Sequence, residues 1–388
     1  MTAVVPERAE LRGALSADDE QFRAELRAWL TEHPPPAVDM PTTDDEVETL
    51  RAWHRTLRSG DWIAIHWPVE YGGRGASPAQ TAIYNEELAR AGAPPLLARG
   101  GISLVGPTLM THGTEEQRRR WIPRILAGDD VWCQLFSEPS AGSDLAGLTT
   151  RAEKRGDVYV VNGQKVWSSY ALVANWAIAL VRTDPNAPNH KGISMLAIPM
   201  TANGIDIRPL RQITGKSEFN EIFLDDVEVP VANLIGPEHE GWRVTNTTLG
   251  NERGGSFVWK EQVLLEIAMG QLIADCATRG VLADPLVRQR LARSWIDVEL
   301  FRLHNARTLA RLARGDEIGP MSSVVKLFWA SLSQRFYDTA VAALAPDVDE
   351  AWIVGMLASR ANSIMGGTSE IQHNIIGERL LGLPREPR

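Results

Sequence analysis

Residues 131–169 read VWCQLFSEPSAGSDLAGLTTRAEKRGDVYVVNGQKVWSS, and the hydrophobic pattern of the chain changes here. A polar, glycine-containing loop, residues 137–144, lies between apolar segments. Asn162-Gly163 separates two strand-like runs and predicts a β-hairpin, because Asn-Gly readily adopts the positive φ angles of a type I′ turn. The second run ends in an indole and two hydroxyls, residues 167–169. Polar loop ends and a flat aromatic side chain held on a sheet suit a planar, hydrogen-bonding cofactor.

The composition is typical of a soluble globular protein. Its 388 residues are enough for two or three domains with a sizeable core. The net charge of −9 argues against a nucleic acid or a membrane surface as partner, since both attract basic patches. The chain shows no 18-residue apolar run and no signal-peptide pattern, so we expect a cytoplasmic protein. Cys133 and Cys276 cannot build a disulfide framework and are expected to pack as small hydrophobic residues.

The period of the hydrophobic pattern changes twice along the chain. It is helical in the N-terminal third, as in the spacing of Phe22, Leu26 and Leu30, becomes two in residues 131–230, and is helical again from Gly241. These periods predict an α+β fold that is mostly α. The expected parts are an N-terminal helical domain (1–130), a middle β domain forming a small barrel or sandwich (131–240) and a C-terminal helical bundle (241–388).

Several common catalytic motifs are absent. Residues 72–75 read GGRG, which is not GxGxxG and does not join a strand to a helix, so a Rossmann site is unsupported. There is no GxxxxGK[ST] loop, and residues 101–106 miss the GxSxG spacing of a nucleophile elbow. The eight histidines show no metal-ligand spacing. We therefore expect neither a metal site nor a catalytic triad.

Eight short blocks of sequence, taken together, identify a protein family far more specifically than any one of them does alone. They are HWP at 66–68, EYGG at 70–73, EELA at 86–89, HGTEEQ at 112–117, SEPSAGSDLA at 137–146, NGQKVW at 162–167, FLDDVEVP at 223–230 and GGTSEI at 366–371. In this order they resemble the acyl-CoA dehydrogenase family over nearly the whole chain. Taken alone, the loop would be read as a surface loop and Trp167 as a core aromatic.

The resemblance implies FAD as the cofactor. The backbone of Phe136 would contact the isoalloxazine, and the hydroxyls of Ser137 and Ser169 would bond its polar edge near N5, which favours the reduced flavin. Ser143 would meet both cofactor and CoA, with Arg253 and Gly367 also implied as substrate-binding residues. The implied cofactor-binding residues are Gln134, Leu135, Phe136, Ser137, Ser143, Trp167, Ser168, Ser169, Thr368, Glu370 and, as an approximate match, Arg279.

The catalytic base differs from the commonest family pattern. Many members carry a Glu two residues before the Thr of the C-terminal motif, where this chain has Gly366. Branches resembling isovaleryl-CoA and long-chain dehydrogenases place it on the first long C-terminal helix, just before an Arg. Here Glu252-Arg253 matches that position, and Gly366 would keep a backbone N–H for polarising the thioester oxygen. Gly254-Gly255 follows, which suggests the close approach of a ligand or a neighbouring helix.

Helical spacing supports Glu252 in part. One helix is expected from Trp242 through Leu272, and a largely apolar face of it carries Glu252. Desolvation on that face would raise the pKa of this carboxyl toward working pH, as a catalytic base requires. The face is formed by Trp242, Leu249, Glu252, Ser256, Trp259 and Val263. The alternative is that Glu252 lies at a hydrated part of the face and pairs with a surface arginine.

The implied reaction is α,β-dehydrogenation of an acyl-CoA to the trans-2-enoyl-CoA. Glu252 would remove an α-proton while a β-hydrogen leaves as hydride to flavin N5, and an electron-transfer flavoprotein or similar acceptor would reoxidise the cofactor. Two family segments depart from the pattern, near Arg279 and at residues 342–346. One alternative is therefore a non-catalytic subunit of a heteromeric dehydrogenase. Another keeps the flavin but lets O₂ accept the electrons, which would make the protein an acyl-CoA oxidase. The family implies a homotetramer, or a heterotetramer with a homologue; the acyl group stays open.

Overall fold

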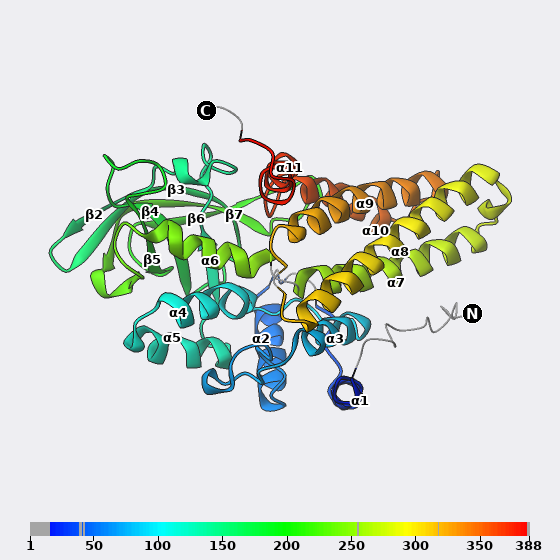
Figure 1. The fold of residues 1–388 in the computed structure, drawn as a ribbon, viewed down its shortest axis with the longest axis horizontal. Helices are drawn as coiled ribbons and strands as arrows, with labels where there is room; N and C mark the ends of the chain where they lie inside the picture. Colours follow the sequence, from blue (N-terminus) through cyan, green and yellow to red (C-terminus); the bar gives the residue numbers. More distant parts are fainter. Residues whose placement is uncertain (1–15, 39–40, 42, 254–255, 317, 386–388) are drawn as a thin grey trace. The chain divides into compact units, whose positions relative to one another are not determined.

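The computed structural model describes residues 16–38, 41, 43–253, 256–316 and 318–385, and its contacts divide the chain into two compact units (Figure 1). The sheet unit comprises Pro35–Gly75 and Pro94–Glu252. The helical unit comprises Met1–Pro34, Ala76–Ala93 and Arg253–Arg388. The predicted α+β class, with N-terminal helices, a middle sheet and C-terminal helices, is confirmed.

The sheet unit is built on one sheet with eight strands among the described residues. In spatial order the main path runs β6-β7-β3-β2-β4-β5-β8, and β1 pairs in parallel with β4. The strands are β1 (Trp132–Leu135), β2 (Arg151–Arg155), β3 (Val158–Ser169), β4 (Trp176–Arg182), β5 (Ile193–Pro199), β6 (Ile205–Leu210), β7 (Phe219–Pro230) and β8 (Leu234–Ile235). Strands β1 to β7 all lie within residues 131–230, where the hydrophobic pattern predicts strands from its period of two.

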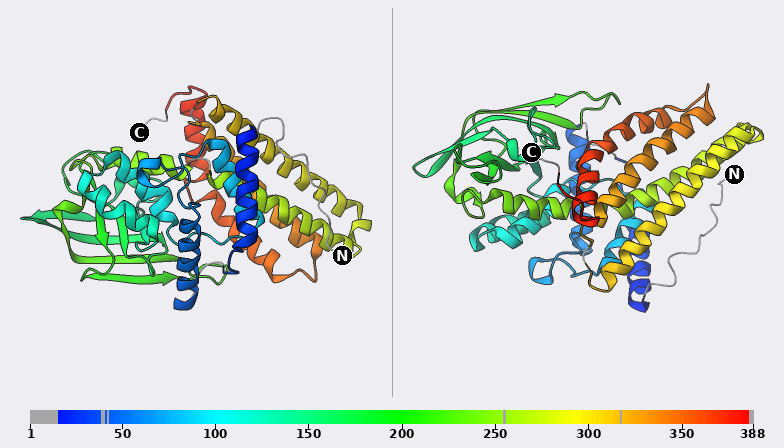
Figure 2. Two further views of the ribbon diagram at one scale, coloured as in Figure 1. Left: turned by 90° about the horizontal axis from the view of Figure 1, so that it is seen from below. Right: turned by 45° about the horizontal axis from the view of Figure 1, so that its top comes forward.

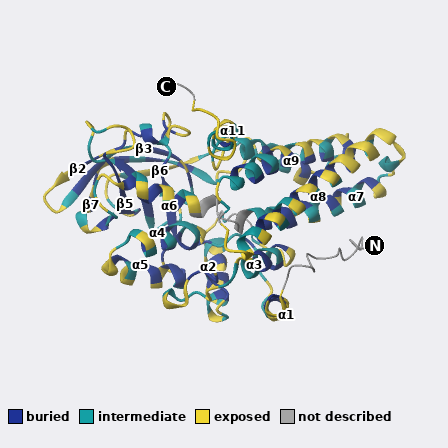
Figure 3. Ribbon diagram, in the orientation of Figure 1, coloured by how far each residue is buried: buried dark blue, intermediate teal, exposed yellow. Residues whose placement is uncertain are grey.

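The sheet wraps around its own hydrophobic core. Inward-facing side chains of β3, β4, β5 and β7 belong to one buried cluster, including Tyr159, Ala179, Ile198 and Val227. Strands from distant parts of the path can share one core only if the sheet curls. Burial colouring shows this core along the strands (Figure 3).

The predicted hairpin at Asn162-Gly163 is wrong. Both residues lie inside the continuous strand β3, where its register with β7 shifts. A Cβ on Gly163 would lie 2.4 Å from Thr150 Oγ1, so the glycine is there for close approach of the neighbouring strand. The Asn162 side chain bonds Asp226 across the β3–β7 pair, at 2.9 and 3.0 Å. The actual turn lies between β2 and β3, where Gly156 has a φ of +62°.

Helices cover parts of this sheet unit. They are α2 (Asp44–Ser59), α4 (Gly106–His112), α5 (Glu115–Ala127) and α6 (Gly241–Arg253). On α6 the buried side chains are Val244, Thr245 and Thr248, and the Thr248 hydroxyl lies 2.8 Å from that of Thr108 on α4. Trp242 and Leu249, expected on the apolar face, are only half-buried. The described face of α6 is thus lined by threonines rather than by large apolar residues.

The helical unit combines early and late parts of the chain. Its helices are α1 (Ala17–Glu32), α3 (Pro78–Arg90), α7 (Ser256–Thr278), α8 (Pro285–Ala313), α9 (Met321–Leu344), α10 (Glu350–Ser359) and α11 (Ser369–Ile375). Capping boxes at Ser16 and Ser77 fix where α1 and α3 begin. Helices α7, α8 and α9 run side by side and share one core around Phe301 and Phe336 (Figure 2).

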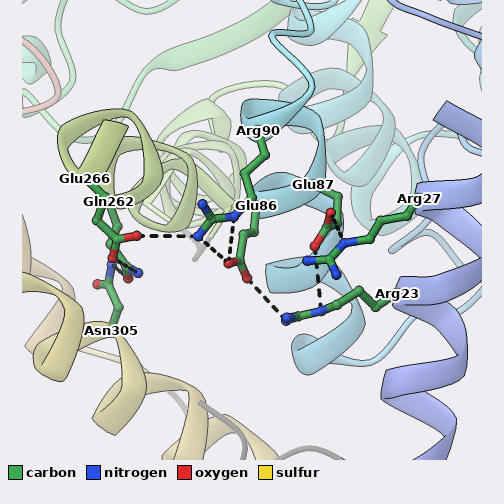
Figure 4. A network of polar contacts seen from close by, with 8 residues as sticks. All are labelled: Arg23, Arg27, Glu86, Glu87, Arg90, Gln262, Glu266 and Asn305. Atoms are coloured by element: carbon green, nitrogen blue, oxygen red, sulfur yellow. Dashed lines mark hydrogen bonds and ion pairs between the residues drawn. The ribbon is translucent and has the colours of Figure 1, made fainter. Parts of the chain in front are cut away.

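A polar network ties the early helices of this unit to the late ones (Figure 4). Arg23 on α1 reaches Glu86 on α3 at 3.2 Å, and Arg90 on α3 reaches Glu266 on α7 at 3.5 Å. Buried Asn305 on α8 donates to Gln262 on α7 at 3.0 Å. These contacts explain why α1 and α3 belong with the C-terminal helices, whereas the three-segment division of the sequence stays a prediction.

Helices α6 and α7 occupy the region where one continuous helix was expected, and Gly254-Gly255 between them lies outside the described residues. Among the described residues, no helix combines the length and apolar character required to cross a bilayer.

Candidate functional site

Trp167 is the most unusual residue of the sheet unit. It lies on β3 at a register shift, its φ is +63°, and 60% of its surface is exposed. A positive φ in a bulky residue costs about 1–3 kcal/mol, and an exposed indole adds unfavourable hydration. Its ring meets Phe219 edge-on, with centroids 6.0 Å apart. The fold therefore holds a flat aromatic surface outward at a cost to stability.

Ser168 joins β3 to the segment that begins the polar loop. It is buried, and its hydroxyl donates to the carbonyl of Gln134 at 2.8 Å. Asn220 on β7 donates to the carbonyl of Ser168 at 3.0 Å. The hydroxyl of Ser168 is therefore engaged within the protein, and the residue fixes where Trp167 lies relative to Gln134.

The loop that follows β1 rests on a buried ion pair that the sequence reasoning missed. Lys165 Nζ donates to Glu138 Oε1 at 2.8 Å and to the carbonyl of Phe136 at 3.0 Å. Glu138 also accepts from the backbone N–H groups of Thr149 and Thr150, at 2.7 and 2.9 Å. The signal in the sequence was a lysine at an inward-facing strand position, which requires a buried anion.

Both members of this pair titrate unusually. Burial opposes the charge on Glu138, but the ammonium of Lys165 and the hydrogen bonds from Thr149 and Thr150 prevail and lower its pKa to about 2. Burial lowers the pKa of Lys165 to about 8, against the attraction of Glu138. Both groups are thus charged at neutral pH, and they make the loop a rigid element.

The remaining predicted residues of the sheet unit divide into buried and accessible ones. Leu135 and Phe136 are buried, so their side chains present no surface to a ligand. The hydroxyls of Ser137 and Ser169 make no hydrogen bond to any described residue, and Ser143 is exposed on the loop. The structure therefore brings a rigid loop, two available hydroxyls and an exposed indole to one region of the sheet unit.

In the helical unit, Gly366 and Gly367 form a turn with φ angles of +64° and +95°. Lys326 on α9 donates to the carbonyl of Gly367 at 2.6 Å, and buried Gln372 on α11 donates to the carbonyls of both glycines at 3.2 Å. No described residue accepts from the N–H of Gly366. Sequence reasoning missed Lys326, whose signal was a lysine among the apolar residues of the first half of α9.

Thr368 and Glu370 follow the turn. The Thr368 hydroxyl accepts from the Ile371 N–H at 3.3 Å and so begins α11. Glu370 is exposed, and hydrogen bonds from its own backbone and from Thr368 lower the pKa of its carboxyl. Both residues therefore have a local structural role besides the cofactor contact implied by the sequence.

Arg279 and the Glu252-Arg253 pair complete the predicted set. Arg279 holds the loop after α9, because its guanidinium bonds the carbonyl of Asp347 and the carboxylate of Asp349, the latter at 2.9 Å. Glu252 and Arg253 lie in the last turn of α6, and their side chains are outside the described part of the chain. Arg279 is thus engaged within the helical unit.

Family models cover nearly the whole chain. Residues 16–129 match the acyl-CoA dehydrogenase N-terminal domain, 133–227 its middle domain and 239–381 its C-terminal domain. The acyl-CoA dehydrogenase IpdE1 of Mycobacterium tuberculosis is 39% identical over 385 residues, which cover 96% of this chain and 99% of that protein. The fold and this similarity both indicate an acyl-CoA dehydrogenase.

Solved structures add to this. The structure titled "Tcur3481-Tcur3483 steroid ACAD" is 30% identical with a TM-score of 0.84, covering 97% of this chain and 100% of that one. The ChsE4-ChsE5 complex of Mycobacterium tuberculosis is also 30% identical, with a TM-score of 0.79, covering 96% and 99%. The chain belongs to the acyl-CoA dehydrogenase family, whose members are oxidoreductases and typically bind FAD.

Proposed function

We propose that this chain is an FAD-dependent acyl-CoA dehydrogenase that converts an acyl-CoA thioester to the trans-2-enoyl-CoA. The observation that carries the proposal is the exposed indole of Trp167, held at positive φ beside a loop fixed by the Lys165–Glu138 ion pair. A protein retains such strain where the rigid surface serves binding. The isoalloxazine is flat and has a polar edge, so it fits these residues.

The residues of the sheet unit suit FAD in detail. Trp167 offers a flat apolar surface, and the hydroxyls of Ser137 and Ser169 have no partner among the described residues. They would donate to the polar edge of the ring and favour its reduced form. When bound, FAD supplies the hydride acceptor at N5. In the helical unit, Thr368 and Glu370 would hold another part of the cofactor.

Glu252 is the base in this proposal, and the backbone N–H of Gly366 is the group that polarises the thioester. Glu252 follows Thr245 by seven residues and Thr248 by four, so its position falls on the same side of α6 as these buried threonines. The α-proton of a thioester is weakly acidic, which is why a hydrogen bond to the developing enolate oxygen matters. Ser143, Arg253 and Gly367 would contribute to substrate binding.

We propose a bulky, polycyclic acyl group as substrate. A similar solved protein is titled a steroid dehydrogenase of this family. A Cβ on Gly366 would meet no atom within 4 Å, so the turn leaves open space where other family members carry a glutamate. Bulk is therefore tolerated at this position.

An assembly is part of the proposal. Three apolar side chains on α8, Ile296, Leu300 and Leu303, are spaced four and three residues apart, and each is more than 40% exposed. Such a stripe suits burial against another subunit. The titles of two similar structures name two components each, which favours a heterotetramer with a homologue over a homotetramer. An electron-transfer flavoprotein or similar acceptor would take up the electrons.

Anaerobic bleaching of the flavin tests the function. The purified protein should be yellow, and among short, branched, long and polycyclic acyl-CoAs the polycyclic thioesters should bleach it fastest. Glu252→Gln should bleach at least 100-fold more slowly, since loss of general base catalysis costs about 10²–10⁴-fold. Glu240→Gln is the matched control, because Glu240 is exposed and its carboxylate pairs with Arg243 alone among the described residues. Equal bleaching by Glu252→Gln and wild type would overturn the assignment of the base.

The second candidate is a non-catalytic subunit of a heteromeric dehydrogenase. The engagement of Arg279 within the helical unit supports it, since this residue was the match for a family segment that reaches the cofactor. A colourless protein that acquires FAD only with a co-expressed homologue would establish this role. Rapid reoxidation by O₂ with product bound would instead indicate an oxidase.

A further inference from the structure

Two side chains from different helices, Lys326 on α9 and Gln372 on α11, hold the Gly366–Gly367 turn. Lys326 on α9 also donates to the carbonyl of Asn362 at 3.0 Å, so a single ammonium closes the loop on both of its sides. Gln372 on α11 is only 1% exposed, and its amide donates to both glycine carbonyls. Every one of these bonds ends on a backbone oxygen of the loop.

The turn needs such support. Two consecutive glycines at positive φ have more conformational freedom than any other pair of residues. A hydrogen bond from an ammonium is about twice as strong as one between neutral groups, so Lys326 restricts the turn more than Gln372 does. With the carbonyls of both glycines bonded, the peptide planes on either side of Gly367 are fixed. The N–H of Gly366 lies in the preceding plane, and this plane falls inside the segment that Lys326 holds at both ends, through Asn362 and Gly367.

The fixed turn presents a free donor. The N–H of Gly366 has no acceptor among the described residues, and the space beside its Cα is open. The two preceding side chains, Ile364 and Met365, are 66% and 43% exposed, although both are apolar. A polar N–H next to exposed apolar side chains matches a ligand in which a carbonyl adjoins a hydrocarbon.

We propose that Lys326 is a positioning residue for the reaction: it fixes the Gly366–Gly367 turn so that the Gly366 N–H meets the thioester carbonyl. This inference rests on the proposed function. Lys326 itself does not touch the substrate, and its effect passes through the backbone. Gln372 plays a supporting part in the same clamp.

Lys326→Met tests the proposal in the full-length protein, because methionine keeps the length of the side chain and removes the donor. The kcat should fall about tenfold to 100-fold, somewhat less than the loss of a whole oxyanion donor, with FAD content and KM little changed. Lys191→Met, at an exposed lysine, is the control and should match wild type. Lys326→Arg, which keeps a charged donor, should restore part of the rate.

An infrared measurement separates positioning from general structural damage. The probe is the trans-2-enoyl-CoA product labelled with ¹³C at the carbonyl, because it binds the oxidised protein without reacting. In wild type the labelled carbonyl stretch should shift to lower frequency on binding, and in Lys326→Met the shift should shrink. Gln372→Met should also reduce this shift, and it provides the test if Lys326→Met does not fold.

The outcomes are distinguishable. If folded variants keep both the wild-type kcat and the wild-type carbonyl frequency, the positioning role is wrong, while bleaching of the wild-type flavin leaves the proposed function standing. If no acyl-CoA in the panel bleaches the wild-type protein, the proposed function fails, and the role of Lys326 in that reaction fails with it.

Discussion

The ammonium of Lys165 lies 2.8 Å from a carboxylate oxygen of Glu138, and neither side chain is more than 4% exposed. Lys165 comes from strand β3, and Glu138 comes from the loop that follows β1. The same ammonium bonds the carbonyl of Phe136, so the pair fixes the loop next to Trp167.

Lys165→Met should strongly destabilise the protein. The substitution leaves the Glu138 carboxylate buried without its cation, which costs about 3–5 kcal/mol of the free energy of unfolding. Lys154→Met is the control: Lys154 is half exposed and 3.8 Å from Glu238, so its loss should cost less than about 1 kcal/mol. Urea denaturation measures both, and equal midpoints for the two variants would show that the buried pair does not stabilise the loop.

The pH dependence of the free energy of unfolding should reveal the lowered pKa of Glu138. Its pKa of about 2 in the folded protein lies below the ordinary value of 4.5, so its stabilising contribution is complete above pH 4.5 and is lost as pH falls toward 2. The difference in unfolding free energy between wild type and Glu138→Gln should therefore shrink as pH falls through this window. Denaturation at pH 7, 5 and 3.5 measures it, and a constant difference would contradict the lowered pKa.

Trp167→Gly should separate stability from cofactor binding. Glycine accepts the φ of +63° without strain, so relief of strain should offset the lost contact with Phe219, and apoprotein stability should stay within about 1 kcal/mol of wild type. The Kd for FAD should rise roughly threefold to tenfold, since a ring-stacking contact is lost. Trp167→Asn, which also tolerates this φ, should behave alike. Unchanged FAD affinity in both variants would mean that the indole is not the flavin's platform.

Gly163→Ala should be more damaging than Gly156→Ala. At Gly156 the space is open, and only the positive φ opposes a side chain, which costs about 1–2 kcal/mol. At Gly163 the new methyl would also collide with Thr150, which adds about 1–3 kcal/mol. Thermal unfolding of the two variants compares them. A smaller loss for Gly163→Ala would mean that the strands separate there more easily than their contacts indicate.

The sequence predicted the fold class because long periodic segments dominate it. Phe22, Leu26 and Leu30 are buried at their predicted spacing, and the core of the sheet unit is supplied by strands of residues 131–230, where the pattern has a period of two. The hairpin prediction failed because Asn162-Gly163 also satisfies another demand. The glycine lets Thr150 approach and the asparagine bonds Asp226, and neither partner is near in sequence.

The candidate site was predicted unevenly for a similar reason. Trp167 and its neighbours followed from a local motif, but the residues that fix them act from elsewhere. Lys165 has its structural role because it bonds Glu138, 27 residues away, and Lys326 because it bonds the carbonyl of Gly367, 41 residues away. Periodicity shows which positions face inward, whereas it does not show which buried polar groups meet.

The division into two compact units limits how segments of this protein could be exchanged with those of a homologue. The chain passes from one unit to the other at residues 34–35, 75–76, 93–94 and 252–253. Replacing one unit by that of a homologue therefore requires four junctions rather than one. A single crossover between α3 and α7 would combine α1 and α3 of one parent with α7 of the other, and would separate pairs such as Arg90 and Glu266. Exchange of the entire chain keeps such pairs together.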